Sequence, residues 1–514
     1  MSKLKKIIEL SKVWIRNNKL ETLLVVLLIL LASFLRLYNI RNTVVFLGDE
    51  GRDALAVKEI VLDLNPTLLG PTASVGGFYL GPIYYYMIAP FMILFAMDPT
   101  GAAVMVAVLG ILTVALLYIF LRKAYGIFPA LIPSLLYAVS PGVTRFSRSS
   151  WNPNPIPFFT LVTLISLYMG IKHSRLRWFV LVGLFLGILI QLHYLGLIIC
   201  GAIGLMTLLL VKPGKWIKVL ASELLGFLVG SSMYLAFELR HNFLNIRAVL
   251  EFITRKGGAT GPRNLNFPWL FYEANRFNIE AVLGGWSKMI SHPITLILLC
   301  SVALALAITW KKKHLFRLET KIIFIYWLIA VLGMSLYKGQ LYHHYFELLF
   351  ITPYMLTAFV LSKVENNSAK IMLSGFTGMA SLFLVLRAPA WEEGSKLIDQ
   401  TERISNQVIE LSEGKPYNFA LITEGNSDHA YRFFLEINKA EPTLLEDKVT
   451  EQLLIVCEKW PEENCAPLGN PLWEIAGFGR SEIVDQVEVY PNTTIYRMEH
   501  HAESIDMIGE PARK

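Results

Sequence analysis

Charged residues are scarce in this sequence, and their scarcity excludes an ordinary soluble protein. Only 17% of the 514 residues are Asp, Glu, Lys or Arg, whereas 54% are hydrophobic. Soluble domains carry about 25% charged residues. Apolar runs of roughly 20 residues, long enough to cross the hydrocarbon core of a bilayer, recur from Leu23 to Arg387 and then stop. We therefore expect a membrane protein with a soluble C-terminal tail.

The motifs of nucleotide-dependent and hydrolytic enzymes are absent as well. The chain has no Walker loop, dinucleotide fingerprint, HExxH or GxSxG sequence. Its net charge of +7 does not indicate nucleic-acid binding, because the basic residues lie mostly in short loops between apolar runs. We therefore predict no nucleic-acid partner, and the energy for any transfer reaction must come from an activated substrate.

The sequence has only four cysteines. Cys200 and Cys300 fall in apolar runs, where buried structural thiols are expected. Cys457 and Cys465 lie close together in the tail. If the tail is outside the cell, these two can form a disulfide, although their spacing alone leaves both redox states open.

Basic residues between the apolar runs predict the orientation of the chain in the membrane. Lys and Arg are retained on the cytoplasmic side, and the basic loops fall on the same side as the basic N-terminal segment. The first run lacks a clear cleavage site, so we expect an uncleaved anchor and a cytoplasmic N-terminus. The predicted spans are 23–40, 101–121, 127–141, 155–171, 178–194, 196–211, 217–237, 292–310, 321–337, 345–362 and 369–387.

One further apolar run, Phe78 to Met97, is harder to place. It contains Pro82, Pro90 and three consecutive tyrosines, which suit an interfacial segment. Because a full crossing would reverse every later loop, we predict that it dips in, lies in the interface or pairs with a second incomplete crossing. The alternative is an ordinary span with an uncounted partner, so the total is about 11–13 transmembrane helices.

These patterns predict a multi-pass protein of the cytoplasmic membrane with two regions. Residues 1–392 form the transmembrane region, whose first outer loop is 41–77, and residues 393–514 form a small extracytoplasmic α/β domain. Two buried strands, a helix between them and a closing hairpin are expected in this domain, at 419–423, 453–456, 428–436, and 487–490 with 494–497.

The first outer loop carries a concentrated group of charged residues. Asp49, Glu50, Arg52 and Asp53 stand at the start of a helical pattern. Asp49 and Asp53 are one turn apart, so both side chains can face the same cleft. An acidic first turn also stabilises many helices that have no catalytic role, so the spacing alone leaves both interpretations open.

The order of these features resembles the GT-C superfamily of lipid-phosphate-sugar glycosyltransferases, in particular the protein O-mannosyltransferases and aminoarabinose transferases (glycosyltransferase family 39). The resemblance is good over the N-terminal part of the chain and extends to the later spans only in layout. The shared features are an N-terminal anchor, the pair Asp49-Glu50 heading a helix in the first outer loop, the element Gly81-Pro82-Ile83-Tyr84-Tyr85-Tyr86, many spans and an outer tail.

The resemblance implies a GT-C fold and the inverting transfer of a sugar from a polyprenyl-phosphate carrier. Asp49 is then the carboxylate that orients or deprotonates the acceptor hydroxyl, which is a poor nucleophile until its proton leaves. Glu50 and Asp53 hold the geometry of the catalytic site, and Arg52 and Tyr84 are candidate substrate-binding residues. No cofactor is firmly implied; Asp49 and Glu50 are the candidate ligands if a divalent metal ion is used.

The second outer loop, Ser140 to Pro155, has features of a phosphate site. Arg145 and Arg148 can clamp the donor phosphate, because a guanidinium group is planar and stays charged. They can equally extend to the membrane interface without binding a ligand. Many relatives carry an aspartate near this point, whereas this chain has Asn152 and Asn154, which we assign to substrate binding and not to a second acidic ligand.

Further candidates lie at the outer ends of later spans. Lys338 is a third donor-phosphate candidate, and His193, Tyr342 and His343 are candidate substrate contacts. A metal site at His343 and His344 is disfavoured, because adjacent side chains on a helix diverge by about 100°.

The leading hypothesis is therefore a glycosyltransferase that acts on a protein, glycolipid or glycan acceptor at the outer face of the membrane. One alternative is a transporter or lipid flippase of envelope biogenesis, and another is a non-catalytic assembly or receptor protein. Transporters place ionisable residues near the membrane midplane, whereas this chain places them at the outer mouth of the spans. The sequence identifies neither the sugar nor the acceptor.

Overall fold

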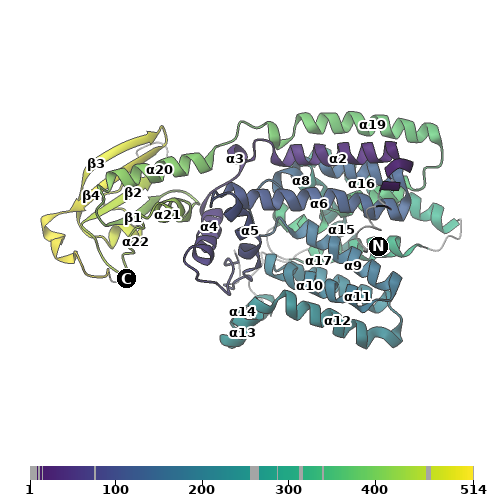
Figure 1. Ribbon diagram of the computed structural model, residues 1–514, viewed down its shortest axis with the longest axis horizontal. Coiled ribbons are helices and arrows are strands. Elements are labelled where there is room, and N and C mark those ends of the chain that lie inside the picture. The colour runs from purple at the N-terminus through teal and green to yellow at the C-terminus, as the bar shows by residue number, and fades with distance from the viewer. Residues whose placement is uncertain are drawn as a thin grey trace. The chain divides into compact units, whose positions relative to one another are not determined.

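The computed structural model describes residues 9, 12–13, 15–73, 77–254, 266–285, 288–311, 316–337, 341–458 and 465–512 (Figure 1). The chain divides into two compact units. The helical unit comprises Met1–Ile40, Leu68–Met87 and Ala102–Glu392, and the mixed unit comprises Arg41–Thr67, Ile88–Gly101 and Glu393–Lys514. Glu393 was also the predicted start of the soluble domain, but the mixed unit additionally includes part of the first outer loop.

Long apolar helices make up most of the helical unit. Six helices in the described part of the chain are long and apolar enough to cross a membrane, or up to eight if each bent helix pair is one span. The six are α2 (Lys19–Leu37), α6 (Thr100–Tyr125), α9 (Ile156–His173), α16 (Lys288–Lys311), α17 (Leu318–Leu336) and α19 (Asn367–Leu386).

The two bent pairs and three shorter helices account for the other predicted spans. The first pair joins α11 (Gly196–Leu210) to α12 (Trp216–Gly230) with a bend of 120°, and the second joins η2 (His343–Leu349) to α18 (Thr352–Leu361) with a bend of 44°. Each predicted span overlaps one of these helices, while the number of crossings stays a prediction. The shorter helices are α5 (Ile83–Leu94), α7 (Ile127–Val139) and α10 (Leu176–Leu192).

The helix α5 lies in the apolar run that was hard to place. It covers 12 residues, or about 18 Å, which is short of the roughly 30 Å of hydrocarbon that a span must cross. The backbone then turns through positive φ angles at Ala96 and Met97. Because α7, with 13 residues, is almost as short, helix length does not distinguish the two, and an incomplete crossing by residues 78–97 stays a prediction.

Glycines allow α10 and α12 to pack closely. A Cβ atom at Gly183 of α10 would lie 1.8 Å from the Glu223 carbonyl oxygen, and one at Gly226 of α12 would lie 1.9 Å from the Val180 carbonyl oxygen. Small residues spaced four apart are typical of closely packed membrane helices. The remaining helices of this unit are α8 (Pro141–Phe146), α13 (Ser232–Arg240), α14 (Leu244–Thr254), α15 (Phe267–Val282) and the short turns η1 (Pro213–Lys215) and η3 (Pro389–Trp391).

A four-stranded sheet with the order β1-β2-β4-β3 forms the centre of the mixed unit. The strand β1 pairs in parallel with β2, in the register Tyr417 to Gln452, and the other neighbours are antiparallel. Its strands are β1 (Tyr417–Ile422), β2 (Gln452–Cys457), β3 (Ser481–Tyr490) and β4 (Thr493–His500). The sequence prediction of two strands, an intervening helix and a closing hairpin is therefore confirmed.

Apolar side chains fill both faces of the sheet. One cluster joins the strands to α20 (Leu397–Leu411) and α21 (His429–Ile437), and the other includes α22 (Trp473–Ala476). Successive residues of β1 and of β2 belong alternately to the two clusters, because neighbouring side chains of a strand point to opposite faces. The short helix η5 (Ala502–Met507) follows the last strand.

The first outer loop adds two helices to the mixed unit. They are α3 (Ile40–Thr43) and α4 (Gly48–Val61), and α4 packs against α21. The side chain of Arg41 connects the loop to two other segments of this unit through ion pairs with Asp98, Asp399 and Glu402. The structure thus confirms the predicted fold class, a helical membrane region with a small α/β region.

Candidate functional site

The acidic motif of the first outer loop forms the first turn of α4. Leu47 precedes this helix in an extended conformation, and the Glu50 carboxylate accepts a hydrogen bond of 3.1 Å from its backbone N–H. The N–H of Gly48 donates to the side-chain oxygen of Asn426 at 2.9 Å. Two backbone N–H groups that a helix start leaves unpaired are therefore satisfied, and the position of the turn is fixed.

Arg52 bridges Asp49 and Asp53. Its Nη1 lies 2.8 Å from Asp49 Oδ1, and its Nη2 lies 2.8 Å from Asp53 Oδ1. The Asp49 side chain is 55% exposed, whereas that of Asp53 is 1% exposed. Of the two carboxylates, only Asp49 is open to a substrate from solvent.

The other two carboxyl groups, Glu50 and Asp53, have raised pKa values because of burial. Burial raises the pKa of Asp53 to about 6, while the charge and hydrogen bonds of Arg52 oppose the rise. Burial also raises the pKa of Glu50 to about 7, against the backbone hydrogen bonds that stabilise its charged form. Of the three carboxyl groups, Asp49 is therefore the one most open to solvent.

A second segment of the mixed unit lies directly against this turn. A Cβ atom at Gly51 would lie 2.2 Å from the Ala430 nitrogen, and one at Gly48 would lie 2.0 Å from Ser427 Oγ. At Gly51 the close atoms are backbone atoms, so only glycine fits there without displacing the segment, whereas at Gly48 the closest atom belongs to a serine side chain that can rotate. The glycines of the motif thus allow the start of α21 to approach the acidic turn.

The two arginines of the second outer loop have different environments. The Arg145 side chain is 59% exposed and forms an ion pair with Glu392. Arg148 is buried and donates a hydrogen bond of 2.9 Å to the carbonyl oxygen of Leu35, near the end of α2. Burial lowers the pKa of Arg148 to about 10, which still leaves it cationic at neutral pH. Arg145 is therefore the accessible cation of the pair.

Three predicted substrate contacts are buried: Asn152 and Asn154 of this loop, and Tyr84, which contacts the loop. Tyr84 and Ser150 share a hydrogen bond of 2.8 Å, and Asn152 donates to the carbonyl oxygen of Leu192 at 2.6 Å. Asn154 donates to the carbonyl oxygen of Ser149 at 2.7 Å. These hydrogen bonds support a structural role for the three side chains, which hold the loop in place.

A cluster of aromatic rings surrounds His193. The His193 ring is stacked on Tyr194 at 4.4 Å between centroids, and it lies 6.2 Å from the ring of His344. His344 in turn lies 4.4 Å from Trp151 and is stacked on Tyr342 at 5.7 Å. Two of the predicted substrate contacts, His193 and Tyr342, therefore meet in one aromatic cluster of the helical unit, together with residues that the site prediction did not include.

His343 lies in a separate polar chain. Its Nε2 is 3.6 Å from Glu280 Oε1, and Arg276 forms ion pairs with both Glu280 and Glu273. Arg276 is 4% exposed. The spacing of these three charged residues on α15 places them on one helix face. The spacing of Glu273, Arg276 and Glu280 could have indicated this polar chain from the sequence, but the site prediction included only His343.

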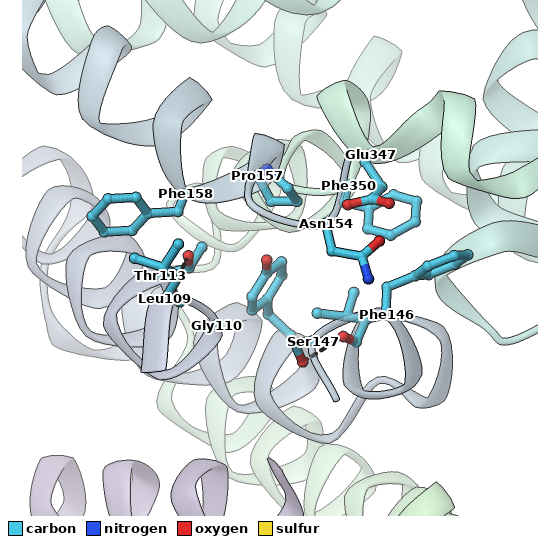
Figure 2. Close-up of a pocket in the computed structure, with 12 residues that line it drawn as sticks. Leu109, Gly110, Thr113, Phe146, Ser147, Asn154, Pro157, Phe158, Glu347 and Phe350 are labelled. Atoms are coloured by element: carbon cyan, nitrogen blue, oxygen red, sulfur yellow. Dashed lines mark hydrogen bonds between the residues drawn. The ribbon is translucent and has the colours of Figure 1, made fainter. Parts of the chain in front are cut away.

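A small cavity in the helical unit joins the second outer loop to η2 (Figure 2). It holds about 10 Å³, about the space of one water molecule. Glu347 and Asn154 point toward each other across it, and Tyr137, Ser147 and Thr113 also line it. Glu347 is fully buried, and neither of its carboxyl oxygens has a hydrogen-bond partner among the described residues.

An apolar groove of about 600 Å³ lies in another part of the helical unit. It is lined by side chains of α7, α15, α16, α18 and α19, such as Leu136, Ile279, Leu298, Val360 and Phe376. Ser140, the first residue of the second outer loop, also lines it.

The structure gives no support for a metal site in the part of the chain that it describes. No group of three or more His, Cys, Asp or Glu side chains could hold a metal ion there. Asp49 and Glu50, the predicted ligands, do not form such a group with a third residue. Lys338, the third predicted phosphate contact, lies outside the described residues.

Comparisons with known proteins agree with this architecture. Residues 80–235 match the family described as dolichyl-phosphate-mannose-protein mannosyltransferase. The comparison with curated protein sequences gave no match. Among solved structures, ArnT from Cupriavidus metallidurans bound to undecaprenyl phosphate is similar with a TM-score of 0.62 and 14% identity, over 93% of this chain and 97% of that chain.

An archaeal enzyme shows a more distant similarity. AglB oligosaccharyltransferase from Archaeoglobus fulgidus, in complex with an inhibitory peptide and a dolichol-phosphate, matches with a TM-score of 0.50 and 11% identity. The match covers 96% of this chain and 75% of that chain. The family match over residues 80–235 and the fold shared with ArnT agree with the resemblance of the sequence to the GT-C superfamily of membrane glycosyltransferases.

Proposed function

We propose that the protein transfers a sugar from a polyprenyl-phosphate donor to a hydroxyl group of a protein, lipid or glycan acceptor at the outer face of the cytoplasmic membrane. The observation that carries this proposal is the position of Asp49. Its carboxylate is exposed at the capped start of α4, and Arg52 holds it in place. A fixed, accessible carboxylate in a GT-C fold suits a general base.

In this reaction Asp49 accepts the proton of the acceptor hydroxyl. The hydroxyl oxygen attacks the anomeric carbon of the sugar from the side opposite the phosphate, and the bond between that carbon and the phosphate oxygen breaks. The sugar is transferred with inversion, and the polyprenyl phosphate leaves as an anion. Arg52 supports the step by fixing the orientation of Asp49, with which it forms an ion pair of 2.8 Å.

The helical unit supplies the donor site in this proposal. The carrier tail lies in the apolar groove, and its phosphate lies at the second outer loop, which meets the groove at Ser140. Arg145 exchanges its ion pair with Glu392 for the phosphate, with Arg148 and Lys338 as further cations. The similar structures of ArnT and AglB contain undecaprenyl phosphate and dolichol-phosphate, which supports a donor of this class.

Two features support an extracytoplasmic location of the mixed unit. The basic loops predict a cytoplasmic N-terminus, with the first outer loop and the tail on the other side of the membrane. In addition, Cys457 and Cys465 form a disulfide, with their Cα atoms 6.0 Å apart. Disulfides persist in compartments outside the reducing cytosol.

The proposal is tested by a transfer assay with the purified, full-length protein. Radiolabelled sugar on polyprenyl-phosphate donors is offered with a membrane extract as the acceptor. We expect transfer by the wild type and a loss of at least about 100-fold in Asp49→Asn, because general bases contribute 10²–10⁴-fold. Glu59→Gln, which changes an exposed carboxylate of the same helix, is the matched control and should retain activity.

No transfer by the wild type from any donor would contradict the proposal and favour a transporter or flippase. Full activity in Asp49→Asn with intact folding would show that Asp49 is not the base. The proposal that the protein is a glycosyltransferase would then still stand. Measuring thermal unfolding of each variant separates loss of function from loss of structure.

A further inference from the structure

The start of α21 packs against the first turn of α4, which also carries Asp49. Gly51 contacts the backbone of His429 and Ala430, where an added Cβ atom would lie 2.6 Å and 2.2 Å from their nearest atoms. Asp49 stands two residues before Gly51 on the same helix turn. The chain therefore brings a segment from its C-terminal part to the acidic motif of its first outer loop.

His429 is the side chain of this segment with unused hydrogen-bonding capacity. Its Nδ1 shares a hydrogen bond of 2.7 Å with Ser427 Oγ, and Asp428 Oδ1 lies 4.0 Å from the same nitrogen. Among the described residues, no hydrogen bond or ion pair involves its Nε2, and 39% of the side chain is exposed. The ring is thus oriented through one nitrogen and open to solvent on the other side.

Burial and four nearby charges act on the pKa of His429. Burial lowers its pKa from the ordinary value, Arg52 and Arg432 lower it further, and Asp428 and Asp49 oppose this change. These groups also show that the ring lies within electrostatic range of Asp49 and of Arg52. A neutral imidazole can donate or accept one hydrogen bond at Nε2, according to its tautomer.

We propose that the acceptor site is shared between α4 and the start of α21, and that His429 contacts the acceptor beside Asp49. This inference rests on the proposed function. Asp49 receives the proton of the reacting hydroxyl, and His429 hydrogen-bonds a neighbouring polar group of the acceptor, such as a second hydroxyl. Ser427 is a positioning residue, because it acts only through the Nδ1 of His429.

This arrangement gives the tail a role in acceptor selection. A buried or oriented polar group that pairs with a substrate hydroxyl discriminates against molecules that lack it. Neither His429 nor Ser427 belongs to the acidic motif, so residues far apart in the sequence contribute to one acceptor site. The donor side is left unchanged, because the proposed phosphate contacts belong to the helical unit.

The experiment measures the transfer rate of the full-length protein against the dilution of the acceptor extract, at saturating labelled donor. We expect His429→Ala to raise the extract concentration for half-maximal rate by about 10-fold and Ser427→Ala by about 2-fold to 3-fold, since one hydrogen bond is lost or loosened. The donor concentration for half-maximal rate should not change. His501→Ala, an exposed histidine of the same unit, is the matched control.

A chemical readout tests the contact without turnover. Diethyl pyrocarbonate modifies exposed imidazoles, and mass spectrometry follows the rate at His429 and His501. We expect the acceptor extract to slow modification of His429 and to leave His501 unchanged, both in the wild type and in the inactive Asp49→Asn variant.

Unchanged acceptor dependence in His429→Ala, or no protection of His429 by the extract, would overturn the inference and leave the proposed function standing. An equal change in donor dependence, or a loss of thermal stability that accounts for the lost rate, would also overturn it by assigning His429 a structural role. Absence of transfer by the wild type would instead contradict the proposed function itself.

Discussion

Glu347 and Asn154 face each other in one small cavity, and three of their oxygen atoms have no hydrogen-bond partner among the described residues. The three atoms are both carboxyl oxygens of Glu347 and the amide oxygen of Asn154. All of them are acceptors when Glu347 is charged, so none can satisfy another. A proton, a water molecule or another donor is needed to stabilise this contact between η2 and the second outer loop.

This contact predicts that Glu347→Gln is tolerated. The new amide can donate to Asn154, and no unpaired charge is buried, so the free energy of unfolding should stay the same or rise by about 1 kcal/mol. Asn154→Asp should instead lower it by about 2 kcal/mol or more, because two carboxyl groups would then share the cavity. Thermal unfolding in detergent measures both changes. A marked loss of stability in Glu347→Gln would show that the site requires the charged carboxylate.

The ion pair between Arg52 and Asp53 predicts that the protein becomes less stable when Arg52 is removed. Replacing Arg52 by Gln leaves the buried Asp53 carboxyl without its guanidinium, which should lower the free energy of unfolding by about 3 kcal/mol. Adding Asp53→Asn should recover part of the loss, because the buried group is then neutral. The two single variants and the double variant are compared by thermal unfolding as a double-mutant cycle. Strict additivity would contradict a direct interaction between Arg52 and Asp53.

The close approach of α4 and α21 makes Gly51 sensitive to substitution. In Gly51→Ala the new Cβ atom would lie 2.2 Å from the Ala430 nitrogen, and backbone cannot move aside as a flexible side chain can. We expect a loss of about 2–3 kcal/mol in the free energy of unfolding and faster proteolysis of the mixed unit. Gly375→Ala in α19 is the control, since a Cβ atom there has no neighbour within 4 Å. Equal stability of the two variants would rule out the tight contact.

Local sequence patterns predicted the helices and the sheet because these elements depend on nearby residues. Apolar runs of span length became helices, and alternating apolar residues in the tail became β1 and β2. The acidic motif was also placed correctly at the start of a helix. Asp49 and Asp53 share the partner Arg52, but only Asp49 is exposed, so a common cleft for the two side chains stays a prediction.

Contacts between distant parts of the chain could not be predicted in this way. Nothing near Gly51 in the sequence indicates that it packs against Ala430. The same holds for the cavity that Asn154 and Glu347 both line. Glu347 lies inside an apolar run and was counted with a membrane span. Its position did carry a signal, because an ionisable residue within a span is a candidate for function. Gly183 of α10 and Gly226 of α12 were a similar signal, because small residues in membrane helices indicate close packing.

The disulfide predicts that the mixed unit is stabilised under oxidising conditions. Cys457 and Cys465 are separated by 8 positions, and closing so short a loop contributes about 2–3 kcal/mol. The variant with both cysteines replaced by serine should therefore unfold at a lower temperature than the wild type. A reductant should lower the midpoint of the wild type to that of the variant and leave the variant unchanged. A reductant-insensitive wild type would contradict the prediction.

The raised pKa of Glu50 predicts how stability changes with pH. In the folded protein this pKa is about 7, against an ordinary value of 4.5, and burial is the main cause. Between these two values the folded state binds more protons than the unfolded state, so the free energy of unfolding falls as the pH rises. The loss approaches about 1–3 kcal/mol above pH 7. In Glu50→Gln the side-chain oxygen can still accept from the Leu47 N–H, but this loss is absent.

We therefore expect the unfolding midpoint of Glu50→Gln to exceed that of the wild type by an amount that grows from pH 5 to pH 8. Thermal unfolding of both proteins across this range measures the difference. Glu59→Gln, which changes an exposed side chain of the same helix, is the matched control. A difference that is constant with pH would mean that Glu50 acts through its hydrogen bond alone, and one that shrinks with pH would mean that its charged form stabilises the turn.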